Sequence, residues 1–212
     1  MPDHKIDCRA VLFDCDGVLV DSREAAEHAW TEWAETLNID PHKVLEGLHG
    51  RRSVDTVNLH VSGRKQKPAL ALIEETELAT AQSTRPIPGG VELFAKLHSH
   101  TAVVTSASPA LANARLNAAG YPAPLVVVSG SDVGTGKPSP QAYLRAAEQL
   151  HVPIQECVIF EDSPAGVEAA RAARPARVII VGGTVLPRTG EIVVRDLRQV
   201  RWVQDSLHVS TI

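Results

Sequence analysis

The sequence contains few cysteines and no cysteine spacing typical of a metal site. Its three cysteines are Cys8, Cys15 and Cys157. The number is odd, and Cys15 and Cys157 lie in or beside segments that we expect to form buried strands, which indicates free thiols in a reducing compartment. We therefore expect a cytoplasmic protein.

Long hydrophobic runs and an excess of positive charge are also missing. No stretch has the length of a transmembrane helix, and the first residues include no apolar region of signal-peptide length. The 212 residues carry a formal net charge of -4. Because nucleic acids and anionic membranes favour a basic face, this charge argues against both as partners. We expect a monomer or a weak homodimer.

What the sequence does contain is an alternation of strand-like and helical segments. With 44% hydrophobic residues, the chain can bury one sizeable core and carry a smaller appended unit. The alternation predicts the α/β class, with a Rossmann-like, doubly wound parallel sheet. We expect strands at residues 9–14, 101–105, 125–128, 157–161 and 177–181.

One interval departs from this alternation, because its apolar periodicity is helical throughout. Residues 22–85 are therefore expected to form an inserted α-helical cap domain of four helices, and residues 1–21 with 86–212 the catalytic core. Two linkers, near residues 20–22 and 84–88, would join the parts and act as a hinge. The face that predicts the first cap helix consists of Ala26, Trp30, Trp33 and Leu37.

The end of the first expected strand is the most informative segment. An apolar run leads into Asp14 and Asp16, and Gly17 follows. Open α/β sheets bind ligands at the carboxyl ends of their strands, and glycine lets the chain turn sharply there. Two carboxylates so close repel each other, and Mg²⁺ is a suitable counterion because it prefers oxygen ligands. The alternative is an acidic surface turn.

Polar residues follow the other expected strands as well. Residues 106–108, Ser-Ala-Ser, precede a helix and can hold a phosphate group at its N-terminus. Lys137 lies in a loop rich in glycine and proline, and Glu161 and Asp162 form a second acidic pair. Taken one at a time, each has a structural explanation: Ser106 as a helix N-cap and Lys137 as a solvated loop charge. Glu161 and Asp162 would be acids in the first turn of a helix, where they favour its dipole. Together, at strand ends, they indicate one site.

In this order the motifs resemble those of the haloacid dehalogenase superfamily, in its branch of small-molecule phosphatases with a helical cap after the first motif. The resemblance covers roughly residues 9–194. Within the branch, Ala29-Trp30-x-x-Trp33 and Leu48-His49-Gly50-Arg51 are most similar to hexose phosphate and polyol phosphate phosphatases, including the 2-deoxyglucose-6-phosphate type. The four matching motifs are Asp14-x-Asp16-Gly17-Val18, Thr105-Ser106, Lys137-Pro138 and Glu161-Asp162-Ser163-x-x-Gly166.

The resemblance implies a Mg²⁺-dependent phosphatase for small phosphate monoesters, such as sugar or polyol phosphates. Asp14 would be the nucleophile that forms an aspartyl phosphate, and Asp16 the general acid and base. Asp14, the backbone carbonyl of Asp16 and Asp162 would hold the metal ion. Glu161 would be a further ligand, or it would contact the metal ligands without binding the ion itself.

The same resemblance gives roles to the phosphate-binding residues. Ser106 and the N–H group of Ala107 would bind phosphate oxygens. Lys137 would balance the charges of the phosphate and of Asp14. In phosphoryl transfer, catalysis depends mainly on positive charge around the phosphate oxygens, which stabilises the transition state.

Substrate choice would depend on the cap, because the core motifs contact only the phosphate. His49, Gly50 and Arg51 lie in a break between expected cap helices, and the resemblance places this loop over the cleft. Arg51 or Arg52 would bind sugar hydroxyls or a second anionic group. The alternative is that both are exposed charges at the start of a helix.

Other activities compete with this interpretation. A β-phosphoglucomutase shares the motifs, but its first cap helix carries a histidine that couples sugar binding to acid catalysis, and Ala26 occupies that position here. A dehalogenase would not need Asp16, and a phosphonate hydrolase would lack an acid there. A non-enzymatic phospho-accepting receiver domain would have no cap. The sequence also departs from the family at residues 173–176, where a glycine is usual and this chain has Ala-Arg-Pro-Ala.

Overall fold

A six-stranded parallel sheet organises the larger part of the protein in the computed structural model, which describes residues 3–211. Its order is β6-β5-β2-β7-β8-β9. The chain starts in the middle, extends to one edge and then crosses to build the other, so the predicted doubly wound α/β fold is confirmed. In chain order its strands are β2 (Ala10–Phe13), β5 (Thr101–Val104), β6 (Val127–Val128), β7 (Cys157–Glu161), β8 (Arg177–Val181) and β9 (Ile192–Val194).

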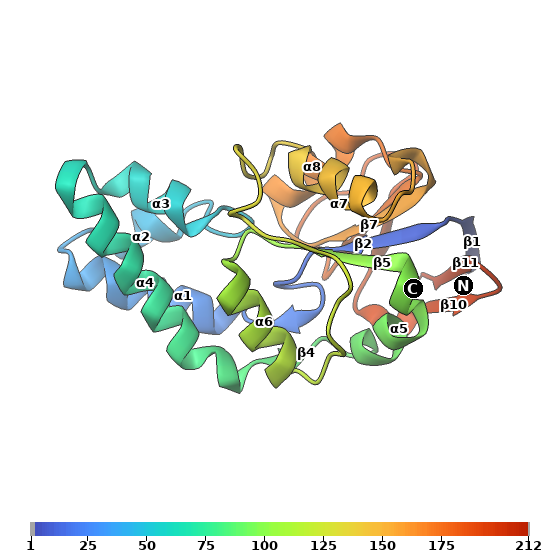
Figure 1. Ribbon diagram of the computed structural model, residues 1–212, viewed down its shortest axis with the longest axis horizontal. Helices are drawn as coiled ribbons and strands as arrows, with labels where there is room; N and C mark the ends of the chain where they lie inside the picture. The colour runs from blue at the N-terminus through green and yellow to red at the C-terminus, as the bar shows by residue number, and fades with distance from the viewer. Residues whose placement is uncertain (1–2, 212) are drawn as a thin grey trace.

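Helices cover both faces of this sheet, which explains why its strands are continuously apolar. Alternate residues of β2 face opposite sides: Val11 and Phe13 belong to one apolar cluster, and Ala10 and Leu12 to the other. Figure 1 shows α7 and α8 on one side of the sheet and α5 and α6 on the other. These helices are α5 (Gly90–Leu97), α6 (Pro109–Ala118), α7 (Gln141–Gln149) and α8 (Pro164–Ala173).

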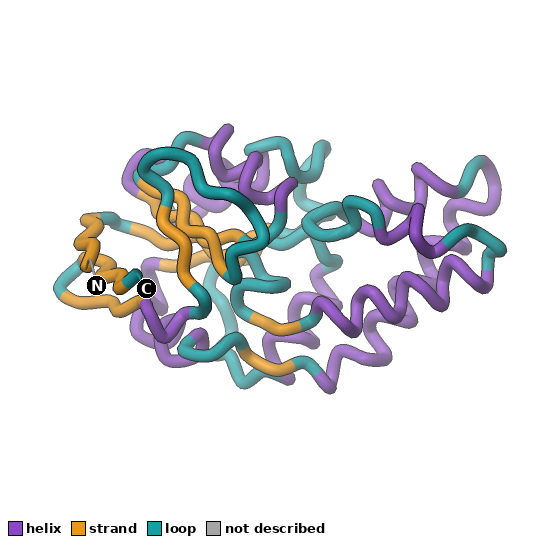
Figure 2. The backbone as a smooth tube through the Cα atoms, turned by 180° about the vertical axis from the view of Figure 1, so that it is seen from behind, coloured by secondary structure: helices purple, strands orange, loops and turns teal. Residues whose placement is uncertain are grey.

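The interval expected to be helical forms four α-helices with a core of their own. Trp30 and Trp33 are buried in that core, and the indole N–H of Trp33 donates to the Ala69 carbonyl at 2.7 Å. Figures 1 and 2 show these helices at one end of the molecule, remote from the chain termini. The helices are α1 (Arg23–Thr36), α2 (Pro41–Leu45), α3 (Ser53–His60) and α4 (Gln66–Thr80), with 3₁₀ turns at Gly63–Lys65 and Ala81–Ser83.

The two segments that join the helical part to the sheet lie side by side. They form a short antiparallel pair, β3 (Val20–Asp21) with β4 (Arg85–Pro86). The linkers at both ends of the insertion are thus hydrogen-bonded to each other.

A small antiparallel sheet at the opposite end was not predicted. It consists of β1 (Asp3–Asp7), β11 (Ser206–Ser210) and β10 (Val200–Val203). Most of β1 is exposed and polar, and the turn from β10 to β11 uses positive φ angles at Gln204 and Asp205 without a glycine. The sequence therefore lacks the usual turn signal there. β9 was missed too, and β6 is shorter than residues 125–128.

At the family's usual glycine position, Arg174 itself adopts the left-handed conformation, with a φ of 59°, and ends α8. All three cysteines are free and buried. Remaining 3₁₀ turns are His98–His100, Ile154–Glu156 and Leu197–Gln199.

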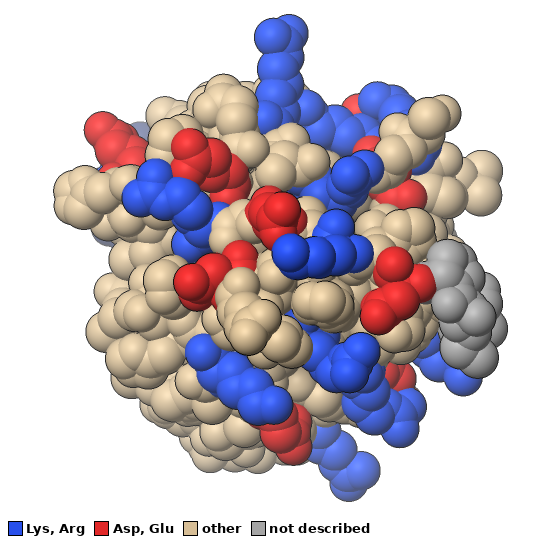
Figure 3. Space-filling view, turned by 90° about the vertical axis from the view of Figure 1, so that its right-hand side faces the viewer, with Lys and Arg blue, Asp and Glu red and all other residues tan. Residues whose placement is uncertain are grey.

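The charged residues on the face seen in Figure 3 are mixed in sign. Among the described residues there, Lys and Arg alternate with Asp and Glu, so no continuous basic surface forms on this face. Within residues 3–211, no helix combines the length and apolar character needed to span a membrane.

Candidate active site

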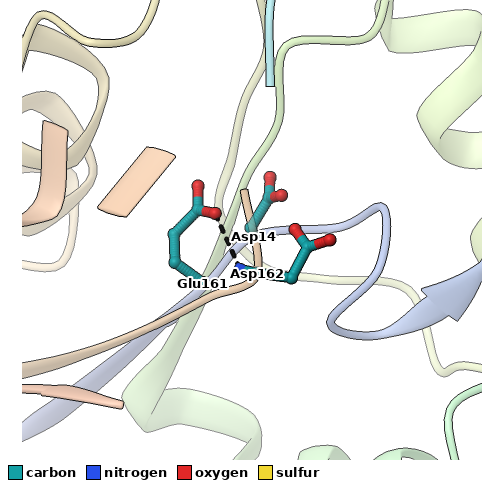
Figure 4. A group of neighbouring side chains, drawn as sticks. All are labelled: Asp14, Glu161 and Asp162. Atoms are coloured by element: carbon teal, nitrogen blue, oxygen red, sulfur yellow. Dashed lines mark hydrogen bonds between the residues drawn. The ribbon is translucent and has the colours of Figure 1, made fainter. Parts of the chain in front are cut away.

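The carboxyl ends of β2 and β7 bring three acids together at the point where the strand order reverses. Asp14 follows β2, Glu161 ends β7, and Asp162 comes next (Figure 4). One oxygen atom from each carboxylate lies within 4.8 Å of the others, and all three residues are buried. This is the crevice in which open α/β sheets bind ligands.

The electrostatics of this cluster favour a cation. Burial and the neighbouring Glu161 carboxylate raise the pKa of Asp14, and the same two causes raise that of Asp162 to about 7. A divalent ion bound by oxygen ligands would offset this repulsion, so the donor set fits Mg²⁺. Gly17 makes room for the cluster: its φ is +83°, and a Cβ atom there would lie 2.1 Å from Asp162 Oδ2.

Lys137 supplies the positive charge inside the cluster. Its Nζ donates to Asp14 Oδ1 at 2.7 Å and to Glu161 Oε1 at 2.5 Å, and its side chain is only 2% exposed. Burial opposes a charged amine, but the carboxylates of Asp14 and Glu161 raise the pKa of Lys137 overall. The lysine is therefore a permanent cation next to Asp14.

The Glu161 carboxylate is fully engaged by protein donors. Oε1 accepts from Lys137 and from the Tyr143 hydroxyl, and Oε2 accepts from the backbone N–H groups of Asp162 and Ser163 and from the Ser163 hydroxyl. Gly166 leaves the space that this carboxylate occupies, since a Cβ atom there would collide with it. These bonds favour support of Lys137 and the 161–163 turn over direct metal binding.

The Asp16 carboxylate is hydrogen-bonded to residues outside the three-acid cluster. Its Oδ1 accepts from the Ser22 hydroxyl at 2.6 Å and from Arg115 Nη1 at 2.9 Å. Its side chain is 32% exposed and lines the same pocket as Asp14. Two acids only two residues apart thus have different environments, one beside a lysine and one beside an arginine.

The expected phosphate donors already have partners within the protein. The Ser106 hydroxyl donates to the Gly50 carbonyl at 2.8 Å, and the Ala107 N–H donates to the Thr105 hydroxyl at 3.0 Å. Both residues line the pocket. Phosphate binding by either group would replace one of these hydrogen bonds. Ser108, in contrast, caps α6 by accepting from the Leu111 N–H.

The cap loop forms part of the pocket lining. His49, Gly50 and Arg51 all line it, and His49 Nε2 lies 2.8 Å from Glu27 Oε1. Gly50 approaches the core so closely that a Cβ atom would lie 2.4 Å from Ser163 Oγ.

Arg52 has a different surrounding from Arg51, because it lies outside the pocket lining. Its guanidinium donates to the carbonyls of Gly130 and Val133 in the loop before Lys137, and it pairs with Asp55. It therefore joins the cap to the core and is not a free charge at a helix start.

Sequence reasoning missed four residues at this site. Arg115 and Glu77 are buried charges, 4% and 5% exposed, which form an ion pair at 3.1 Å. The sequence does contain a signal for both, namely a charge at a position where the helical period predicts an apolar residue. Arg115 follows Leu111 by four residues, and Glu77 follows Ile73 by four, each on a buried helix face. Two further residues, Arg23, which pairs with Asp162, and Tyr143, gave no comparable signal.

Comparisons with known proteins agree with this site. A family model described as haloacid dehalogenase-like hydrolase matches residues 8–174. Hexitol phosphatase A of Escherichia coli is 36% identical, covering 91% of this chain and 93% of its own. 2-Deoxyglucose-6-phosphate phosphatase 1 of Saccharomyces cerevisiae is 32% identical, covering 92% and 90%. A β-phosphoglucomutase structure from Clostridium difficile shares the fold, with a TM-score of 0.81, 21% identity and coverage of 92% and 94%.

Proposed function

This chain belongs to the haloacid dehalogenase-like hydrolases, and we propose that it is a Mg²⁺-dependent phosphatase of sugar or polyol phosphates that works through an aspartyl phosphate. As a hydrolase whose similar curated relatives are named sugar and hexitol phosphatases, it is a phosphoric monoester hydrolase. One observation carries the proposal. The buried Asp14 forms a hydrogen-bonded ion pair with Lys137 and lies in a cluster with Asp162 that fits a divalent ion.

The metal ion would be held by Asp14, Asp162 and the backbone carbonyl of Asp16, and when bound would offset the negative charges of the phosphate and the nucleophile. An Asp14 oxygen forms a bond to phosphorus as the ester P–O bond breaks. Asp16 gives a proton to the departing alkoxide and later takes one from the water that hydrolyses the intermediate. Lys137 holds Asp14 in place and supplies positive charge beside the phosphate.

The cap, residues 22–85, would enclose the substrate. The pocket between the cap loop and the core has a volume of about 80 Å³, which corresponds to a few water molecules and not to a sugar phosphate. We therefore expect the cap to move for substrate entry, with the paired linkers β3 and β4 as its hinge. Once closed, the cap would exclude bulk water.

The cap loop would recognise the sugar or polyol. His49 and Arg51 line the same pocket as Asp14 and Asp16, so both are near the organic group of a substrate whose phosphate lies at Asp14. Both side chains can hydrogen-bond to hydroxyl groups. The proposed substrate class rests on this placement and on the named activities of the relatives.

A phosphatase is favoured over a mutase by the residue at position 26. Ala26 lines the pocket, and its methyl side chain can neither donate nor accept a hydrogen bond. His28, two residues later, is 70% exposed and pairs with Glu32, so it does not substitute. No side chain at position 26 makes acid catalysis depend on a bound sugar, so water would compete with a sugar for the aspartyl phosphate.

The proposal is tested with a panel of phosphorylated metabolites. Hexitol, hexose and glycerol phosphates are incubated with the protein and Mg²⁺, and released phosphate is measured, with EDTA as the control. We expect release from several sugar or polyol phosphates that EDTA abolishes. No release from any member would contradict the phosphatase assignment, and conversion of glucose 1-phosphate mainly to glucose 6-phosphate would favour the mutase.

A further inference from the structure

Arg115 is a buried cation that the proposed mechanism leaves without a role. It lies in the last turn of α6, on the face that packs into the protein, and its side chain is 5% exposed. A guanidinium group is costly to bury without partners, and here two carboxylates provide them. Nη1 donates to Asp16 Oδ1 at 2.9 Å, and Nη2 donates to Glu77 Oε1 at 3.1 Å.

The two partners come from different parts of the molecule. Asp16 belongs to the loop after β2, in the core, whereas Glu77 belongs to α4, in the helical part. Glu77 is itself 5% exposed, and Ser53 Oγ lies 3.5 Å from its other carboxylate oxygen. Arg115 is therefore held on one side by the cap while it binds Asp16 on the other.

Both donors to Asp16 act on the same oxygen atom. Ser22 and Arg115 donate hydrogen bonds to Oδ1, and no group within residues 3–211 donates one to Oδ2. Ser22 lies at the N-cap position of α1, yet its hydroxyl serves Asp16 and not the helix end. The carboxylate is thus fixed through Oδ1, which leaves Oδ2 as the oxygen able to exchange a proton.

We propose that Arg115 is a positioning residue for Asp16, anchored by Glu77 of the cap, which orients the carboxylate that protonates the leaving alcohol. This inference rests on the proposed function, because it needs Asp16 to be the acid. It adds a link between cap and chemistry: the cap contributes Glu77, so the acid is fully oriented only while α4 packs against α6.

The main test compares two esters in Arg115→Met. A sugar phosphate has a poor leaving group that needs a proton, whereas p-nitrophenyl phosphate does not. We expect kcat for the sugar phosphate to fall about 10- to 100-fold, with KM changed less than about threefold and a much smaller loss for p-nitrophenyl phosphate. Equal losses for both esters, or a rise in KM alone, would overturn the proposal, the latter by indicating direct substrate binding.

Asp16→Asn separates this inference from the proposed function. It should give the same selective loss on the sugar phosphate. If it does and Arg115→Met does not, the positioning role is wrong and the acid role stands. If Asp16→Asn lowers both esters equally, the acid role and the inference built on it are both wrong.

A double-variant comparison adds a readout that a structural role would not produce. If Arg115 acts through Asp16, Arg115→Met introduced into Asp16→Asn should lower kcat for the sugar phosphate less than about threefold further, because the group it positions is gone. Multiplied losses would contradict the inference. Glu77→Gln should give a weaker version of the selective loss seen in Arg115→Met.

Misfolding is controlled by removing both members of the buried pair. Arg115→Met leaves Glu77 buried without its cation, whereas Arg115→Met with Glu77→Met removes both charges, which should restore thermal stability toward the wild-type value. We expect the selective loss on the sugar phosphate to persist in this stable variant. Recovery of wild-type kcat along with stability would show that Arg115 only supports the fold.

Discussion

Lys137 Nζ lies 2.7 Å from Asp14 Oδ1, and both side chains are almost completely buried. The two residues are far apart in the chain, and the parallel sheet brings them together at its carboxyl edge. Because the lysine also donates to Glu161, one cation balances two carboxylates. The site therefore depends on this lysine for stability as well as for chemistry.

Replacing Lys137 by alanine should lower both activity and stability. Asp14 and Glu161 would remain buried without their shared cation, and breaking a buried ion pair in this way costs about 3–5 kcal/mol. Phosphate release with Mg²⁺ and urea unfolding without it measure the two effects. Lys96→Ala, at an exposed position on α5, is the matched control. Wild-type turnover in the stable fraction of Lys137→Ala would contradict its placement beside the phosphate.

Asp162→Ala should raise the Mg²⁺ concentration needed for half-maximal activity. Asp162 is one of the three carboxylates whose oxygens lie within 4.8 Å of one another, and its loss removes one anionic ligand. The measurement is a Mg²⁺ titration of phosphate release. Asp132→Ala, a carboxylate outside the acid cluster and the pocket lining, serves as the control. An unchanged titration in Asp162→Ala would remove Asp162 from the ligand set.

Without metal, the free energy of unfolding should fall as the pH rises from about 4 to about 7. Asp162 has a pKa near 7 in the folded protein and near 3.8 when unfolded, so the folded state binds more protons in this window and ionisation destabilises it. Mg²⁺ binds the ionised carboxylates and should therefore stabilise more at pH 7.5 than at pH 5. Urea unfolding at both pH values, with and without Mg²⁺, measures this.

Asp162→Asn is the control for that experiment. The amide does not titrate, so the variant should lose part of the fall in stability between pH 5 and pH 7.5, and Asp14, whose pKa is also raised, should account for part of what remains. A metal-free protein that becomes more stable over this interval would contradict the assigned direction of the shift.

Arg51→Ala and His49→Ala should alter preference among sugar and polyol phosphates. Both side chains line the pocket, and p-nitrophenyl phosphate offers them no hydroxyl groups. We expect kcat/KM for the best sugar phosphate to fall about tenfold, as expected for a lost hydrogen bond to a charged group, with a smaller change for p-nitrophenyl phosphate. Arg64→Ala, on an exposed turn of the cap, is the control. A uniform decrease across the panel would indicate that the loop only supports the cap.

The sequence was sufficient to predict the sheet and the acids at its edge. Those features depend on local patterns: an apolar strand, a carboxylate after it, and a glycine or helix start next. Asp14, Lys137 and Asp162 could be placed together because parallel strands end at a common edge. The strand pairs at the C-terminal end were missed because β10 and β11 are joined without a typical turn sequence.

The partners of the predicted residues could not be found in the same way. Arg115 reaches Asp16 across 99 positions of sequence, and Ser106 donates to Gly50 across 56. Such contacts depend on how the cap packs against the core, which no local pattern specifies. The one local signal for Arg115 is its charge at a helix position where apolar residues recur, and sequence reasoning did not use it.

The most direct test of the account is phosphate release from a hexitol phosphate by the wild-type protein and by Asp14→Asn, both with saturating Mg²⁺. The amide keeps the size of the side chain but lacks the anionic oxygen that attacks phosphorus, so we expect loss of turnover with the cooperative thermal transition retained. Acid quenching during turnover of a phosphorus-labelled substrate should trap label on the wild-type protein and not on the variant. Phosphate release by folded Asp14→Asn at the wild-type rate would contradict the central claim.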